Sequence, residues 1–308
     1  GPNNFFYAFN MHYNPKSLNF GYGETWFDNA HNVVMNTLAV QGAFGIITYL
    51  SIFALAILSI IIAHRNKQTN YHVLIVGVAF LIAHLVQNVT VFENPTSYLY
   101  FMFWLAMINK LTEKPAVPRL DNKGRAIGVP DKRISGGAVG TIGFITIIVI
   151  FIFNIQPARA NMKTLDALKV LANRPAQGAE AVKSALAFNS PHIDDIRSDL
   201  ARQISQILSG NLEGAGIEKD KVLEFYFIAN NALQLNVGLH PLDIRNYMVL
   251  AQLNQAAYGF TGDASYIIAH GKNLDDALKY SPKRQQIIYN IVNLKMQLGQ
   301  YDESIKML

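Results

Sequence analysis

The 308-residue sequence contains no cysteine. This absence excludes disulfide bonds, thiol nucleophiles and zinc–thiolate sites, and it leaves the redox compartment open. Charged residues are also scarce, at 15% of the chain against about 25% in typical soluble domains. Because the apolar residues are concentrated in the first half, this composition indicates a membrane part followed by a soluble part.

Common catalytic and cofactor motifs are missing as well. The sequence has no P-loop, no GxGxxG after a strand, no HExxH and no GxSxG, and its eight histidines lack the spacing of metal ligands. We therefore expect neither a metal nor another cofactor. The net charge of +5 does not indicate a nucleic-acid partner, because much of the excess lies in one loop between apolar segments.

Four apolar segments are predicted to cross a membrane, at residues 43–63, 71–89, 97–111 and 136–155. The first and the fourth are each about 20 residues long without a charged side chain, which is the length that a hydrocarbon core requires. The second is interrupted by polar residues, and the third is short. The sequence thus predicts an all-α protein with a loop over 1–42, a membrane domain over 43–157 and a soluble domain over 158–308.

Basic residues in the connections between these segments set the expected orientation. Seven lie in the stretch 110–133, and Arg65 and Lys67 follow the first segment, whereas the turn at 90–96 has none. By the positive-inside bias, the two basic connections are cytoplasmic. This orientation places both the loop and the soluble domain on the outer side of the membrane.

The soluble domain is expected to consist of amphipathic helices. Apolar residues recur at helical spacing, with glycine and proline between the runs, at residues 164–171, 179–188, 193–208 and 221–235. Further along, Pro241 and Pro282 begin two similar runs 41 residues apart, and each is expected in the first turn of its helix. No alternating strand pattern competes with this prediction.

The last 20 residues, YNIVNLKMQLGQYDESIKML, resemble a tetratricopeptide repeat. The LGQYDES stretch is expected to form the turn between the two helices of that repeat, although the 41-residue spacing departs from the usual 34. The chain stops inside the second helix, so the carboxyl end looks truncated. Stacked hairpins of this kind expose a groove that binds peptides or partner proteins.

A histidine stands at the mouth of the first predicted span. His31 and Asn32 open the run HNVVMNTLAVQGAFG, in which Gly42 and Gly45 follow directly before the apolar segment. An imidazole accepts a proton near neutral pH, because its unperturbed pKa is about 6.5. His31 is therefore a candidate general base beside a bilayer.

The HN-x9-GxxG pattern resembles the signature of the O-antigen ligase and polymerase family of membrane glycosyltransferases. The preceding GPNNFFYAFNMHYNP and GYGETWFDNAHN are similar to the end of that family's large extracytoplasmic loop, and QNVTVFENPTSYLYFMFWLAM is similar to its later membrane hairpin. The resemblance covers residues 1–157. It implies a GT-C-like membrane fold in a bacterial inner membrane, of which this chain, without the family's earlier helices, is a fragment.

The resemblance implies His31 and Asp28 as catalytic residues, and Glu24, Lys16, Asn32, Gly42 and Gly45 as substrate-binding residues. Asp28 either accepts a hydrogen bond from the imidazole or caps a helix that is expected to begin near Ala30. Asn32 either orients the imidazole or is itself the cap. The two glycines either let a lipid chain or another helix approach closely or belong to ordinary helix packing.

The departing diphosphate requires positive charge, and few basic residues are available for it. No arginine precedes Arg65, and Lys16 is the only lysine in that stretch, so Lys16 either contacts phosphate or is a solvated loop residue. In the family, arginines of the large loop hold the diphosphate. The resemblance therefore implies that these arginines lie in an amino-terminal part outside this sequence and that the fragment alone is inactive.

The expected function is transfer of a glycan from undecaprenyl diphosphate to an acceptor hydroxyl on the outer face of the membrane. The partners would be a polyprenyl-diphosphate-linked donor, a glycan, lipid or protein acceptor, membrane lipid, and a protein bound by the repeats. Three alternatives stay open: an O-antigen polymerase, a protein O-oligosaccharyltransferase, and a non-catalytic membrane anchor for a repeat scaffold. The helical domain carries no catalytic constellation, which favours a recognition role for it.

Two polar residues interrupt the second predicted span. His84 and Asn88 are four residues apart and therefore lie on the same face of a helix. Polar groups inside a membrane usually face the protein interior. The pair is expected either to hydrogen-bond a neighbouring helix or to line a cavity for the lipid carrier, and Glu93 in the following turn is expected near the same outer surface.

The predicted orientation is open to a direct test. Reporter fusions after Pro157 should show an extracytoplasmic location, and fusions within 112–135 a cytoplasmic one, because of the asymmetry in basic residues. A cytoplasmic signal after Pro157 would place His31 on the wrong side of the membrane for the proposed chemistry.

Overall fold

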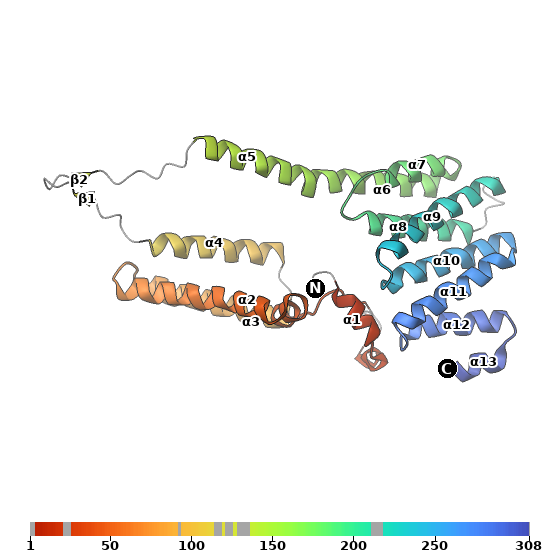
Figure 1. Cartoon of the computed structure of the whole chain (residues 1–308), viewed down its shortest axis with the longest axis horizontal. Coiled ribbons are helices and arrows are strands. Elements are labelled where there is room, and N and C mark those ends of the chain that lie inside the picture. The colour runs from red at the N-terminus through yellow and green to blue at the C-terminus, as the bar shows by residue number, and fades with distance from the viewer. Residues whose placement is uncertain are drawn as a thin grey trace. The chain divides into compact units, whose positions relative to one another are not determined.

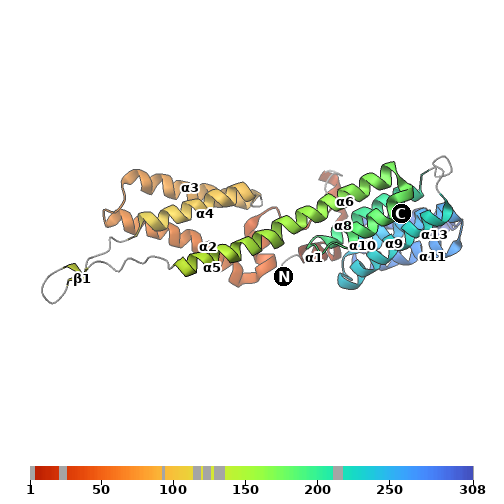
Figure 2. The same cartoon turned by 90° about the horizontal axis from the view of Figure 1, so that it is seen from above.

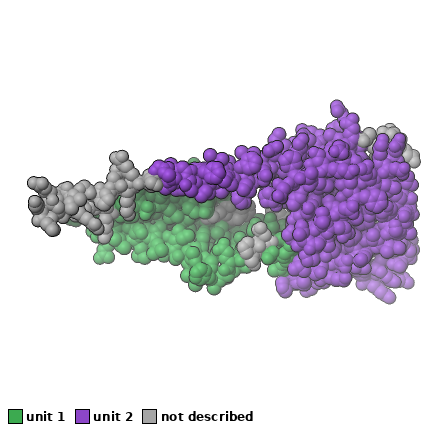
Figure 3. Space-filling view, turned by 45° about the horizontal axis from the view of Figure 1, so that its top comes forward, with its two compact units in different colours: residues 1–9, 22–133 green, residues 10–21, 134–308 purple. Residues whose placement is uncertain are grey.

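The structure is a computed structural model that describes residues 4–20, 26–91, 94–113, 119–120, 126–127, 136–210 and 218–307. The chain forms two compact units, coloured separately in Figure 3: unit 1 is Gly1–Phe9 with Tyr22–Arg133, and unit 2 is Asn10–Gly21 with Ile134–Leu308. The described part is helical apart from one antiparallel pair of two-residue strands, β1 (Arg119–Leu120) and β2 (Ala126–Ile127). The all-α prediction is confirmed.

Unit 1 is built on three helices that lie side by side, α2 (Val33–Arg65), α3 (Tyr71–Thr90) and α4 (Pro95–Leu111), as Figures 1 and 2 show. Each begins after an asparagine whose side-chain oxygen accepts a hydrogen bond from the backbone N–H three residues on. The three caps are Asn32, Asn70 and Asn94. These bonds satisfy backbone donors that have no partner inside the helix.

The bundle of unit 1 buries a small apolar core and leaves a large apolar surface. The core comprises Phe53, Ala56, Ile60, Leu81, Phe101 and Ile108. Outside it, Leu55 on α2 and Phe103 on α4 are both 62% exposed. Apolar residues on the inner and the outer side are expected of helices that lie in lipid.

Three described helices are long and apolar enough to cross a membrane: Val33–Arg65, Tyr71–Thr90 and Gly136–Asn173. They contain the first, second and fourth predicted spans. The third predicted span coincides with α4, which has 17 residues and is not one of these three.

The fourth predicted span continues without a break into the helical domain. α5 (Gly136–Ile150) passes through a π-helical turn, η2 (Phe151–Ile155), into α6 (Gln156–Asn173). Pro157 lies just after this turn; a proline ring would collide with the carbonyl four residues earlier in a regular α-helix, and the wider turn relieves that collision. The predicted boundary after Pro157 therefore falls within one continuous helix.

Unit 2 continues with helices that stack as successive hairpins (Figure 1). They are η3 (Pro175–Gln177), α7 (Gly178–Leu186), α8 (Ile193–Leu208), α9 (Lys219–Leu239), α10 (Ile244–Thr261), α11 (Ala264–Tyr280), α12 (Gln285–Gln297) and α13 (Tyr301–Met307). The helices predicted at 164–171, 179–188, 193–208 and 221–235 are confirmed as α6 to α9. One core lies among α6 to α10, and a second joins α10, α11 and α12.

The turns within the last two hairpins each contain a glycine in the left-handed conformation. Gly262 has φ 71° between α10 and α11, and Gly299 has φ 75° between α12 and α13. A residue with a side chain rarely adopts this conformation. The helix–turn–helix predicted around LGQYDES is therefore present.

The predicted position of the two prolines was wrong. Pro241 and Pro282 lie before the helices, each within a four-residue turn that begins at His240 or Ser281. Proline disfavours the helical conformation of the residue before it, and His240 (ψ 66°) and Ser281 (ψ 71°) are accordingly non-helical and end the preceding helices. The prolines thus stop one helix instead of opening the next.

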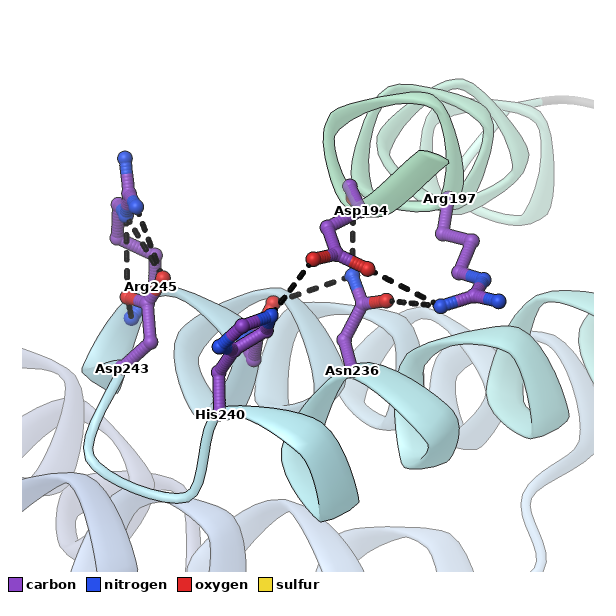
Figure 4. Close-up of polar contacts among 7 residues, drawn as sticks. Asp194, Arg197, Asn236, His240, Asp243 and Arg245 are labelled. Atoms are coloured by element: carbon purple, nitrogen blue, oxygen red, sulfur yellow. Dashed lines mark hydrogen bonds and ion pairs between the residues drawn. The ribbon is translucent and has the colours of Figure 1, made fainter. Parts of the chain in front are cut away.

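A cluster of polar side chains joins α8 to α9 near the first of these turns (Figure 4). Asp194 accepts a hydrogen bond from Arg197 (3.1 Å), and its other oxygen lies 2.8 Å from His240 Nε2. Asn236 is fully buried, accepts a bond from Arg197 (2.9 Å) and donates one to the backbone oxygen of Asp194 (2.9 Å). Because Arg197 and the backbone oxygen of Asp194 satisfy its amide, Asn236 can be buried at the helix junction.

Asn236→Ala should destabilise unit 2 by about 1–3 kcal/mol, because it leaves buried hydrogen-bonding groups without their partner. The measurement is denaturant unfolding of the full chain in detergent, followed by circular dichroism. Asn231→Ala on the exposed side of the same helix is the control and should cost nothing, since alanine favours helix formation. Equal effects of both changes would contradict the structural role of Asn236.

Candidate functional site

The start of α2 carries the predicted histidine–asparagine pair. Asn32 has extended backbone angles (φ −162°, ψ 111°), and its side chain accepts a hydrogen bond from Met35 N at 2.9 Å. Capping, one of the two alternatives for Asn32, is thereby confirmed. The prediction that a helix begins near Ala30 with Asp28 as its cap is wrong, because Asn32 is the cap and the helix starts at Val33.

Gly42 interrupts α2 ten residues after the cap. Its backbone has φ 73° and ψ −168°, a conformation that is essentially restricted to glycine and that divides α2 into a short first helix and a long second one. The break falls one residue before the predicted start of the first span. The sequence therefore identified where the loop ends, although it did not predict a short helix there.

Gly45 is needed because of this break. A Cβ atom on Gly45 would fall inside the van der Waals distance of the Gln41 side chain, which folds back over the interruption. A Cβ on Gly42 would meet nothing within 4 Å. The neighbour that Gly45 accommodates thus comes from α2 itself, not from a second helix. Gln41 was not recognised from the sequence, although its place directly before Gly42 is a usable signal.

Within unit 1, a series of ring contacts among aromatic side chains ends at the imidazole of His31. The Phe27 ring lies edge-on to it with a centroid distance of 5.8 Å, and Phe9 lies 5.0 Å from Phe27. Phe5 continues the series at 6.4 Å from Phe9. The His31 side chain itself is exposed.

The other predicted site residues are distributed unevenly. Asp28 lies in a bend before Asn32, with its side chain exposed. Lys16 belongs to η1 (Pro15–Phe20), which is part of unit 2, so the structure does not bring it together with His31 in one unit. Glu24 and Glu93 lie outside the described residues.

A second polar group is buried among the three helices of unit 1. Asn88 Nδ2 donates to Tyr49 Oη (2.9 Å) and lies 3.2 Å from His84 Nε2. The contact with Tyr49 on α2 matches the prediction that His84 and Asn88 hydrogen-bond a neighbouring helix.

The imidazole of His84 is stacked against aromatic rings. Phe101 lies 4.6 Å away with an interplanar angle of 11°, and Phe80 lies 6.2 Å away with an angle of 7°. Tyr49 follows Gly45 by four residues, so it is on the same side of α2, and this spacing could have revealed it. The hydrogen bond between Asn88 and Tyr49 joins α3 to α2, and α2 is the helix that contains most of the HN-x9-GxxG motif.

A surface depression of about 460 Å³ lies on unit 2 between α7 and α9. Its lining residues are Lys183, Asp220, Leu223, Glu224, Phe227, Ile228 and Asn231. None of the site residues predicted from the sequence is among them. No family model matches the chain, and no curated protein or solved structure is significantly similar to it.

Gly42→Ala should destabilise unit 1 by about 1–3 kcal/mol, since alanine is strained at φ 73°. The apparent melting temperature of the detergent-solubilised full chain should fall accordingly. Gly143→Ala in α5 is the matched control, because a Cβ there meets nothing within 4 Å and the backbone is helical, so that helix should become slightly more stable. A Gly42→Ala protein as stable as the control would contradict the described break.

Proposed function

We propose that the protein is a membrane glycosyltransferase of the O-antigen ligase type, which moves a glycan from a polyprenyl diphosphate to an acceptor hydroxyl on the outer face of the membrane. The observation that carries the proposal is the structure of the HN-x9-GxxG stretch. Asn32 caps a short helix, Gly42 ends it at the predicted membrane surface, and His31 stands exposed at its start.

His31 has the role of general base in this proposal. A donor with a polyprenyl chain is confined to the bilayer, so a base at the mouth of a membrane helix can meet its diphosphate end. The imidazole would remove the acceptor hydroxyl proton as the oxygen attacks the sugar. The ring contact with Phe27 restrains the imidazole.

Residues 1–32 contain no arginine. Other groups must therefore supply the positive charge that stabilises the departing diphosphate. Backbone dipoles at the start of the helical segment that follows Gly42 would favour an anion there. They would assist cationic groups without replacing them.

The acceptor class stays open within the proposal. Ligase, polymerase and protein O-oligosaccharyltransferase share the donor and the base, and they differ in the acceptor hydroxyl. The second candidate function is a membrane-anchored scaffold, and the observation in its favour is that unit 2 has two apolar cores of its own. Incubation with a lipid-linked glycan and separate glycan, lipid and peptide acceptors discriminates among all four.

In the full-length protein, His31→Ala should lower glycan transfer about 10²- to 10⁴-fold, because a general base contributes that factor. Expression and membrane insertion should be unchanged, since the side chain is exposed. His72→Ala, at an exposed position near the start of α3, is the control and should retain activity. Transfer within threefold of the unsubstituted protein after His31→Ala would leave the histidine without a catalytic role.

A further inference from the structure

Arg284 occupies a position where a buried arginine is unfavourable in three ways. It is the N-cap of α12, and its side chain makes no capping hydrogen bond there. A cation at a helix N-terminus opposes the helix dipole, and short polar side chains are preferred as caps. The side chain is also completely buried, which is costly for a charged group.

The turn before α10 corresponds to the turn before α12, and we call these two turns the first and the second corner. The first corner has a preferred kind of cap residue. There Asp243 is the N-cap of α10, and its carboxylate accepts a hydrogen bond from Arg245 N at 3.0 Å. Figure 4 shows this carboxylate facing the guanidinium of Arg245. In both corners a proline turn closes with a hydrogen bond to the N-cap residue, from Asp243 N to His240 O and from Arg284 N to Ser281 O. The two turns therefore share a local structure, and they differ in having an aspartate or an arginine as the cap.

The partners of the Arg284 guanidinium include neutral groups of a distant segment. Nη2 donates to Asn10 Oδ1 at 2.6 Å, and Cζ lies 4.5 Å from the centroid of the Tyr13 ring. Nη1 donates to Gln286 Oε1 at 3.3 Å. Desolvation lowers the pKa of Arg284 to about 10, so the group stays protonated at neutral pH.

The same corner also holds the backbone of that segment. Ser281 Oγ donates to the backbone oxygen of Asn10 at 2.8 Å. Asn10 and Tyr13 are 1% and 3% exposed, and they are the two buried residues of the stretch 4–19. These two side chains and the turn at 281–284 that receives them therefore contribute to the attachment of residues 10–20 to unit 2.

We propose that Arg284 is a positioning residue: it anchors residues 10–20 to the helical unit and thereby fixes the start of the loop that leads to His31. The local cost of the arginine is offset by the contacts with Asn10 and Tyr13, which no other residue type would make together, because they require a fork of donors and a flat cation. The catalytic consequence rests on the proposed function, whereas the anchoring does not.

Lys16 provides a direct readout of the anchor. It lies in the anchored segment and is the only lysine or arginine before Arg65, so trypsin cleavage there releases a defined amino-terminal peptide. In the full chain in detergent, Arg284→Met should accelerate cleavage after Lys16 about tenfold or more, because hydrogen bonds to a charged group hold the segment closed. Circular dichroism should show that unit 2 remains folded, since methionine fills the buried space without a charge.

Arg245→Met is the matched control, because it removes a guanidinium from the start of α10 and leaves the second corner intact. Its rate of cleavage after Lys16 should equal that of the unsubstituted chain. Asn10→Ala tests the contact from the other side and should accelerate cleavage like Arg284→Met, with the double variant no faster than the faster single one. Asn10→Asp alone should slow cleavage, because the new carboxylate forms an ion pair with Arg284. Combined with Arg284→Met, the same change should accelerate cleavage, because the buried carboxylate then has no cation as a partner.

Glycan transfer supplies the second readout. In the full-length enzyme, Arg284→Met should lower kcat about tenfold while the KM for the donor is unchanged, and Arg245→Met should change neither. Cleavage after Lys16 that is unaffected by both Arg284→Met and Asn10→Ala would overturn the anchor. Faster cleavage with an unchanged kcat would overturn the positioning role. If the unsubstituted protein transfers no glycan, the proposed function fails, and the proteolysis still decides whether Arg284 holds the segment.

Discussion

An apolar helix that crosses a bilayer has to satisfy its backbone hydrogen bonds itself, because the hydrocarbon offers no partners. This constraint governs how the chain of unit 1 enters its apolar helices. Asparagine caps precede all three, and in α2 the ladder is interrupted only at Gly42, directly before the predicted span. His31, the cap Asn32 and the break at Gly42 lie close together in the sequence because this is where the chain begins its first long apolar helix.

Much of the fold followed from the sequence. Apolar length located the helices of unit 1, and apolar spacing located those of unit 2, because both signals are local. The continuous helix through Pro157 was missed, since a π-helical turn that relieves a proline leaves no pattern in the residues around it. The prolines at 241 and 282 were misplaced, because proline is compatible both with a first helical turn and with the turn before it.

The candidate site was predictable in part. The HN-x9-GxxG stretch predicted the cap Asn32, because a cap depends on neighbours in the sequence, and the catalytic role of His31 stays a prediction. The function of the glycines was not predictable, since it depends on how Gln41 folds over Gly45 after the chain has turned at Gly42. Tyr49 was missed because its partner, Asn88, is 39 residues away.

The sequence favoured a division of labour in which the loop and membrane helices act on substrate and the helical repeats recognise a partner. The packing of residues 10–20 within unit 2 changes that division, because part of the predicted loop contacts the helices of unit 2. A guanidinium buried against an amide and an aromatic ring is a poor source of stability. Its presence is easier to understand as a means of specifying where one segment lies. On this argument, the helices of unit 2 determine where residues 10–20 lie.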